Sequence, residues 1–153
     1  MQQLAQLLTP ARTLCRAPGI SRKRLFETLS SVIAQDQISL PSEEIFSQLV
    51  AREKLGSTAL GKGIAIPHCR IENCTHPLGT LVTLQDPIDF DAPDNQPVDL
   101  LFVLLVPNEA HQLHLDILAN VAGLFSQDEF CTALREAGDN AGLHDIATSW
   151  PEQ

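Results

Sequence analysis

The chain has 153 residues, of which 44% are apolar and 19% are charged. This composition supports a hydrophobic core and argues against intrinsic disorder. The length is that of one domain, which we expect to span residues 1–153 with its core at about residues 4–150. The net charge of −9 disfavours nucleic-acid binding, because nucleic-acid-binding domains usually carry a basic surface.

No apolar run in the sequence is long enough to cross a bilayer. The best candidate, Leu100 to Val106, has the length of a strand. The N-terminal residues lack the basic and apolar regions of a signal peptide, so we expect a cytoplasmic protein without membrane insertion. In that compartment the four cysteines are expected to be free thiols.

The first third of the chain is predicted to be mostly helical. Ser21 has the position of an N-cap, and apolar residues from Leu25 to Ile33 recur with helical spacing. Pro41 and the glutamates after it are typical of a first helical turn. The elements expected here are a helix at 4–8, a strand at 12–16, a helix after Ser21, and a helix from about Pro41 to Gly56.

The middle of the chain is predicted to form strands, and the last third helices. Residues 98–106 are almost continuously apolar, which is typical of a strand that is buried on both faces. The elements expected are strands at 80–84, 88–90 and 98–106, and helices at about 109–125, 126–137 and 140–150. This order predicts an α/β fold with a mixed sheet between helical layers.

The segment from Ile64 to His68 contains the first candidate functional residue. A short apolar run is followed by Pro67, which has no N–H to donate and therefore ends strand pairing or lies on an edge. We expect His68 to be presented where this strand ends, on a rigid support. Functional residues are often held in this way.

His114 and Arg52 are the other candidates. His111 and His114 share one face of the helix at 109–125, and His114 lies at the edge of its core-facing stripe. From the spacing alone, a half-buried histidine that hydrogen-bonds to backbone is the favoured interpretation of His114. Arg52 lies on the apolar stripe of its own helix, so its stem could simply cover apolar surface, or its guanidinium could bind an oxyanion.

Two imidazoles, an arginine and a glycine-containing loop between them suit the chemistry of a phosphorylated imidazole. Neutral imidazole is a good nucleophile near pH 7. A second imidazole, a guanidinium and loop amides could hold the phosphoryl oxygens, and such positioning accounts for most of the catalysis of phosphoryl transfer. The predicted site therefore consists of His68, His114 and Arg52.

Four motifs, in chain order, carry a resemblance to a known family. They are Arg52-Glu-Lys-Leu-Gly-Ser-Thr, Gly63-Ile-Ala-Ile-Pro-His68, the segment from Phe90 to Pro107, and His114-Leu-Asp-Ile-Leu118. Together they resemble the enzyme IIA proteins of the bacterial phosphotransferase system, fructose/mannitol superfamily, and within it the nitrogen-regulatory (PtsN-like) branch. The resemblance covers about residues 4–150.

The resemblance implies a mixed sheet flanked by helices and a mainly regulatory phosphotransferase component that needs no cofactor. His68 matches the histidine that is phosphorylated by a histidine phosphocarrier protein (HPr-like or NPr-like). His114 matches the second active-site histidine and Arg52 the site arginine, whereas His111 has no family role and is expected at the surface or behind the site. The implied partners also include regulatory targets such as transporters or sensor kinases.

Three positions depart from the commonest family pattern. Ala59 replaces a glycine and is expected to stiffen the loop. Lys62 is expected to add positive charge near the phosphoryl site, and Cys69 follows His68 where glycine is frequent. These departures put loop conformation and partner choice in question.

Two alternative functions remain open at this point. One is an interaction module of the same fold that accepts no phosphoryl group. The other is a zinc-binding domain that uses His68, Cys69, Cys74 and His76, although this spacing differs from that of common zinc sites. Cys69 would also point away from His68 on an extended strand.

Overall fold

The computed structural model describes residues 3–19, 21–109 and 111–151, without the side chains of Gln3 and His111. Its strands are β1 (Thr13–Ala17), β2 (Ala59–Gly61), β3 (Ile64–Ala65), β4 (His68–Ile71), β5 (Leu78–Ile88) and β6 (Val98–Pro107). Its helices are α1 (Gln3–Leu7), a 3₁₀ turn (Pro10–Arg12), α2 (Arg22–Asp36), α3 (Ser42–Lys54), α4 (His111–Phe125), α5 (Asp128–Glu136) and α6 (Asn140–Ser149).

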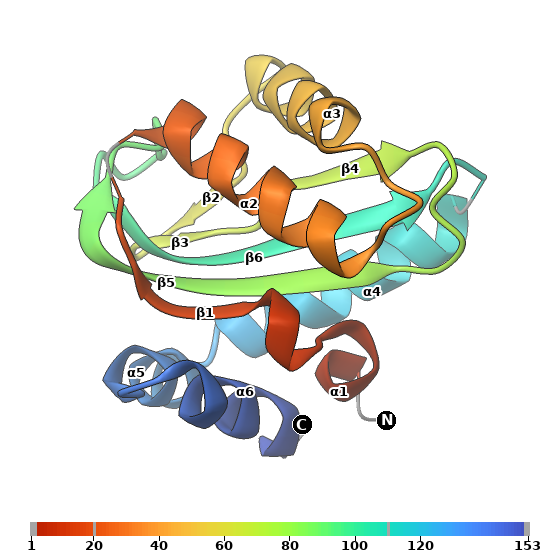
Figure 1. Ribbon diagram of the computed structural model, residues 1–153. Coiled ribbons are helices and arrows are strands. Elements are labelled where there is room, and N and C mark those ends of the chain that lie inside the picture. The colour runs from red at the N-terminus through yellow and green to blue at the C-terminus, as the bar shows by residue number, and fades with distance from the viewer. Residues whose placement is uncertain (1–2, 20, 110, 152–153) are drawn as a thin grey trace.

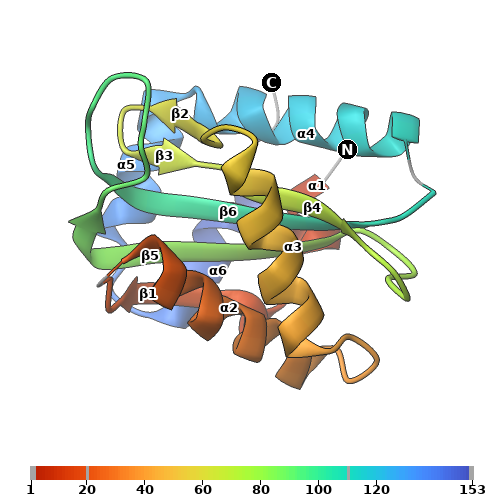
Figure 2. The same cartoon turned by 90° about the horizontal axis from the view of Figure 1, so that it is seen from above.

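The sheet is mixed, as predicted, and its six strands follow the order β1-β5-β6-β3-β2, with β4 also pairing with β6. β5 and β6 are antiparallel, whereas β3 and β4 run parallel to β6 one after the other along the same edge. The predicted central position of β6 is confirmed. Figure 1 shows α2 and α3 on one face of the sheet and the remaining helices on the other. Figure 2 shows α2 and α3 side by side over the strands.

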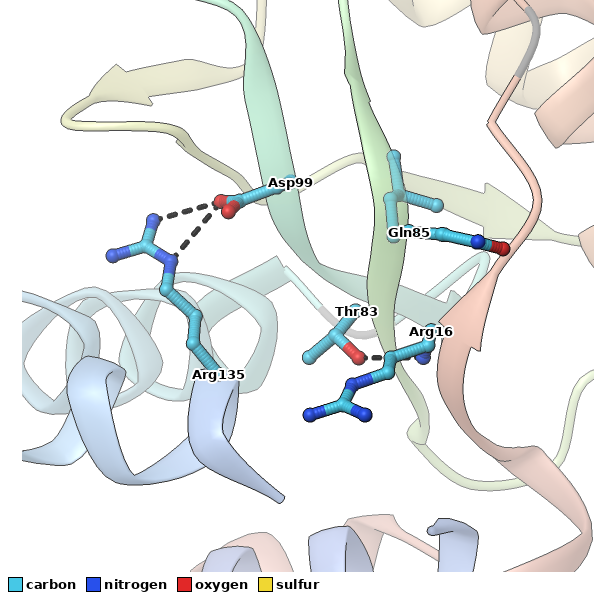
Figure 3. A pocket seen from close by; sticks show the side chains of 6 residues that line it. Arg16, Thr83, Gln85, Asp99 and Arg135 are labelled. Carbon is cyan, nitrogen blue, oxygen red and sulfur yellow. Dashed lines mark hydrogen bonds and ion pairs between the residues drawn. The ribbon is translucent and has the colours of Figure 1, made fainter. Parts of the chain in front are cut away.

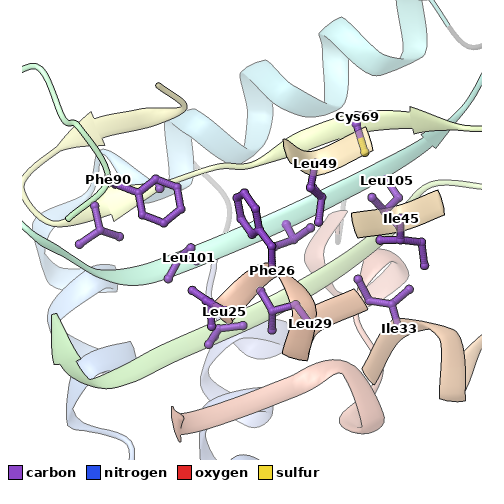
Figure 4. Close-up of a cluster of buried hydrophobic side chains, with 14 of the residues drawn as sticks. Leu25, Phe26, Leu29, Ile33, Ile45, Leu49, Cys69, Phe90, Leu101 and Leu105 are labelled. Atoms are coloured by element: carbon purple, nitrogen blue, oxygen red, sulfur yellow. The ribbon is translucent and has the colours of Figure 1, made fainter. Parts of the chain in front are cut away.

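Alternate residues of β6 pack in the two halves of the core, one on each face of the sheet. Leu101, Val103 and Leu105 face α2 and α3, where they join a cluster that includes the side chains shown in Figure 4. Leu100 and Leu104 face the opposite layer, together with apolar residues of α4 and α5. Because successive side chains of a strand point to opposite faces, an almost unbroken apolar run was needed to fill both clusters.

The short helix at the N-terminus, the strand that follows it and the helices of both layers lie where the sequence predicts them. The Ser21 hydroxyl accepts a hydrogen bond from the Arg24 amide, as expected of an N-cap. The prediction of two separate strands at 80–84 and 88–90 was wrong, because β5 is one long strand. Its pairing with β6 shifts register between Thr83 and Ile88, and Pro87 lies in this irregular part, where no ladder donor is required of it.

Across the described residues, we find no helix with the length and apolar character needed to cross a membrane.

Candidate functional site

His68 begins β4, directly after the proline. β3 pairs with Leu100 and Leu101 of β6, and β4 resumes pairing at His68 opposite Leu104. Between them, the Pro67 carbonyl accepts a hydrogen bond from the Leu104 amide at 2.9 Å. The expectation that His68 lies where a strand ends was therefore wrong. Pro67 removes one donor and interrupts the ladder, but β6 continues beyond it and pairing starts again.

The tautomer of His68 is set by the carbonyl of Ile66, two residues earlier in the chain. Nδ1 lies 2.7 Å from the carbonyl oxygen of Ile66, which can only accept, so Nδ1 carries the proton and the lone pair of the neutral ring is on Nε2. The pKa of His68 is lowered from 6.5 by burial and by the charge of Arg52, although the Ile66 bond and Glu53 act in the opposite direction. The ring is thus neutral at pH 7, with Nε2 as its nucleophilic atom.

His114 packs against this imidazole. The two ring centroids are 5.5 Å apart and the planes make an angle of 71°. Burial lowers the pKa of His114, and the neighbouring His68 and Arg70 lower it further. Its Nε2 is buried and has no hydrogen-bond partner among the described residues. A buried polar atom without a partner costs about 1–3 kcal/mol, so this nitrogen would be stabilised by a hydrogen-bond partner brought next to it.

Arg52 shares a pocket with His68. This pocket has a volume of about 410 Å³ and is lined by Arg52, residues 57–60, Ile66, His68 and one side of α4. The Nη1 atom of Arg52 donates to the Gly56 carbonyl at 2.9 Å, which also closes the end of α3. The structure therefore brings the three predicted site residues together, since His68 contacts His114 and shares the pocket with Arg52.

The loop amides are less available than the sequence suggested. The Thr58 amide and hydroxyl both donate to the carboxylate of Glu53, and the Ala59 amide donates to the Ser57 hydroxyl at 3.1 Å. Glu53 is only 8% exposed, and Arg22 donates at 3.3 Å to Oε2, the oxygen that also accepts the Thr58 amide. The expectation that loop amides bind phosphoryl oxygens was wrong for Thr58 and Ala59, because these amides already donate to Glu53 of α3 and to Ser57.

Glu53 is a residue that the sequence analysis missed. Its carboxylate holds Thr58, the Thr58 carbonyl accepts from the Ile66 amide at 3.1 Å, and the Ile66 carbonyl accepts from His68 Nδ1. A continuous chain of hydrogen bonds thus runs from a buried carboxylate to the imidazole. A glutamate beside Arg52 in a helix gives no sign in the sequence that its side chain is buried.

Comparison with known proteins identifies the family. Residues 6–149 match the family described as "Phosphoenolpyruvate-dependent sugar phosphotransferase system, EIIA 2". The chain belongs to this EIIA 2 family. A nitrogen regulatory protein of Pseudomonas aeruginosa is 45% identical over 146 residues, which are 95% of this chain and 95% of that protein. One of Escherichia coli K12 is 44% identical over 147 residues, which are 95% of this chain and 90% of that protein.

Solved structures agree with this assignment. The crystal structure of the nitrogen regulatory protein IIA-Ntr from Neisseria meningitidis aligns with a TM-score of 0.85 and 38% identity, and covers 95% of this chain and 99% of that one. The IIA mannitol structure from Escherichia coli aligns with a TM-score of 0.74 at 12% identity, covering 92% of this chain and 98% of that one. This second likeness concerns the fold, which is therefore the predicted mannitol/fructose-like EIIA fold.

Lys62 of this EIIA protein does not line the pocket of His68, contrary to expectation. It lies in the turn between β2 and β3, and its Nζ is 3.5 Å from Asp128 of α5. The Arg135 side chain donates to the Lys62 carbonyl at 2.8 Å. The β2–β3 turn points away from His68, because β3 runs from this turn toward Pro67 and separates the two ends.

The residues of the zinc alternative do not form a metal site in this EIIA fold. Cys69 packs in the core beneath α2 and α3, on the face of β4 opposite to His68, and Cys74 donates to the His76 carbonyl. Among the residues that the structure describes, no three His, Cys, Asp or Glu side chains are grouped so that they could hold a metal ion. The side chain of His111 lies outside the described part, so its expected place at the surface or behind the site stays a prediction.

Proposed function

We propose that this protein carries a phosphoryl group on Nε2 of His68. The observation that supports this best is the 2.7 Å contact between His68 Nδ1 and the Ile66 carbonyl, which leaves Nε2 as the free lone pair. Membership of the EIIA 2 family makes the chain a phosphotransferase system component. We propose a histidine phosphocarrier protein as its donor.

The transfer is a direct exchange of one P–N bond for another. The Nε2 lone pair of His68 forms a bond to phosphorus while the P–N bond of the donor phosphohistidine breaks, and its electron pair returns to the donor ring. The proton on His68 Nδ1 stays in place and the ring becomes positively charged. The Ile66 carbonyl accepts from that N–H and stabilises the charge, which also keeps the ring a good leaving group for onward transfer.

Arg52 and His114 are proposed to hold the phosphoryl oxygens. A guanidinium presents a planar set of donors that matches the geometry of phosphate. The unpartnered Nε2 of His114 would gain an acceptor when a phosphoryl group is present on the neighbouring ring. Stabilisation of charge by such fixed donors is the main contribution that a protein makes to phosphoryl transfer.

We further propose a regulatory role in the cytoplasm, in which phosphorylation decides which target is bound. The relatives named nitrogen regulatory protein support this choice. Leu60 and Leu115 beside the pocket are 50% and 60% exposed and offer apolar contact area to a partner. A phosphoryl group adds nearly two negative charges at the centre of this surface. Targets such as transporters or sensor kinases would then bind one form better than the other.

The test is phosphorylation with phosphoenolpyruvate, the first enzyme of the system and its histidine carrier. Intact mass should show one acid-labile phosphoryl group, and His68→Ala should abolish it. His76→Ala is the matched control, because His76 is an exposed histidine outside the pocket, and it should be phosphorylated normally. A wild-type protein that accepts no phosphoryl group but still binds a target would instead support the pure interaction module.

Two further variants test the oxyanion contacts. His114→Ala should fold but transfer slowly, and Arg52→Lys should also be slow, because an ammonium cannot reproduce the planar fork of the guanidinium. Transfer at the wild-type rate in either variant would remove that residue from the mechanism.

A further inference from the structure

A second hollow lies at the other end of the sheet. Its volume is about 540 Å³, and it is lined by Arg16, Thr83, Leu84, Gln85, Asp99 and Arg135. Figure 3 shows that these side chains come from β1, β5, β6 and α5. Asp99 precedes Leu104, the partner of His68, by five residues of β6, or about 16 Å along the strand. No residue of this hollow lines the His68 pocket.

The hollow carries a positive charge on a strongly acidic protein. It contains two guanidinium groups and one carboxylate, whereas the net charge of the chain is −9. Arg135 holds Asp99 through Nε at 3.0 Å and Nη2 at 2.9 Å, which leaves its Nη1 without a partner among the described residues. Arg16 is exposed, and within the described structure its guanidinium makes no hydrogen bond or ion pair. Several charged donors therefore remain unused.

An unfavourable backbone conformation directs Arg16 toward this hollow. Between Leu14 and Ala17, β1 has one residue more than its partner strand β5, which is a β-bulge. Arg16 in the bulge has a φ of 54°, a conformation that is uncommon for residues other than glycine. Bulges re-aim side chains and often lie next to functional sites. In Figure 3 the Arg16 guanidinium extends toward the side of the hollow where Arg135 lies.

Thr83 adds a buried donor at the base of the hollow. It is 4% exposed, and its hydroxyl oxygen accepts the Arg16 amide at 2.8 Å. The hydroxyl proton has no acceptor among the described residues. A hydroxyl offers one donor besides its acceptor sites, so Thr83 can donate to an oxygen placed in the hollow.

We propose that this hollow binds a small organic anion through a phosphate or carboxylate group. The Arg16 guanidinium and Arg135 Nη1 match the oxygens of either group, and the Thr83 hydroxyl supplies a neutral donor. The volume is within the range of small-molecule sites and much larger than a bare phosphate needs. The site does not depend on phosphorylation of His68.

The experiment is a titration of ¹⁵N-labelled protein with glucose 6-phosphate, citrate and inorganic phosphate. Saturable amide shifts around Arg16, Thr83 and Arg135, with a Kd at or below about 1 mM for at least one of the organic anions, are expected. The phosphorylated sugar and the carboxylate distinguish the two kinds of anion. Inorganic phosphate should bind more weakly than the organic anion that fits, because it fills little of the volume.

Variants decide whether the site is specific. Arg16→Gln should weaken binding at least about tenfold, which corresponds to about 1.4 kcal/mol. Arg70→Gln removes the same charge from an exposed arginine of β4 and should bind normally. His68→Ala should also bind normally, so the result stands apart from the fate of the proposed phosphoryl transfer. The absence of saturable shifts, or equal weakening in Arg16→Gln and Arg70→Gln, would overturn the proposal.

Discussion

Thr58→Val tests the hydrogen-bond chain behind the His68 pocket. Thr58 is 5% exposed and its hydroxyl donates to the buried carboxylate of Glu53. Valine keeps the shape of the side chain and removes this donor. A hydrogen bond to a charged group contributes about 1.5–3 kcal/mol, so we expect a loss of about 2 kcal/mol in the free energy of unfolding. For a chain of this size the loss lowers Tm by about 4–8 °C.

Urea denaturation and thermal unfolding measure this loss. Thr28→Val is the matched control, because the exposed Thr28 hydroxyl donates only to the Arg24 carbonyl of its own helix. Its stability should change by no more than about 0.5 kcal/mol. If the two variants are equally stable, Glu53 does not hold the loop as the structure indicates.

The same variant should also slow phosphoryl transfer. The Thr58 carbonyl holds the Ile66 amide, and the Ile66 carbonyl holds the His68 ring. A small displacement of a reacting group costs up to about a hundredfold in rate, and we expect about tenfold here. Ring ¹⁵N shifts of His68 should show a larger fraction of the tautomer protonated on Nε2. A stability loss without any change in rate or tautomer would refute the coupling and leave Glu53 a purely structural residue.

Three other predictions rest on single observations. The folded-state pKa of His68 is lowered mainly by burial, so phosphoryl transfer should be constant near neutral pH and fall only below pH 6.5. Below pH 6.5 the unfolded chain binds more protons than the folded chain, so the free energy of unfolding should also decrease there. Urea titrations at each pH should show a smaller decrease for His68→Gln. Gly79→Ala should lower the free energy of unfolding by about 1–3 kcal/mol or more, because its Cβ would lie 2.5 Å from the Phe102 ring. In the control Gly123→Ala, the new Cβ has nothing within 4 Å and should stabilise α4 by up to about 1 kcal/mol. Burial raises the pKa of Cys69 to about 12, so thiol labelling should leave Cys69 unmodified until the chain is unfolded.

The sequence was sufficient to predict those parts of the fold that are determined by one physical cause. An apolar run from Leu100 to Val106 can be stable only if both faces of the strand are buried, and β6 is indeed central. The helices followed from the spacing of apolar residues and from caps such as Ser21. The apolar pattern is less informative on α4, where Leu115 is 60% exposed. It borders the pocket instead of the core.

The details of the site could not be predicted, because they depend on partners that are distant in the chain. Nothing near Glu53 in the sequence indicates that its carboxylate takes the Thr58 donors, so loop amides seemed free for phosphoryl oxygens. The proline rule correctly predicted an interruption at Pro67 but could not show that β6 extends beyond it. Likewise, Lys62 seemed close to His68 in the sequence, yet a strand lies between them and Asp128 holds its charge.

The position of His68 finally depends on the register of one strand pair. His68 lies opposite Leu104, whose side chain faces α4, while Cys69 lies opposite Leu105, whose side chain faces α3. A slip of one residue would exchange these faces and would place a thiol in the pocket and the imidazole in the core. Three hydrogen bonds to two carbonyl groups oppose the slip. The Gly63 carbonyl accepts from the Asp99 and Leu100 amides before β3, and the Pro67 carbonyl accepts from the Leu104 amide after it. The backbone carbonyl at position 67, where the ladder is interrupted, therefore helps to fix the face on which the histidine lies.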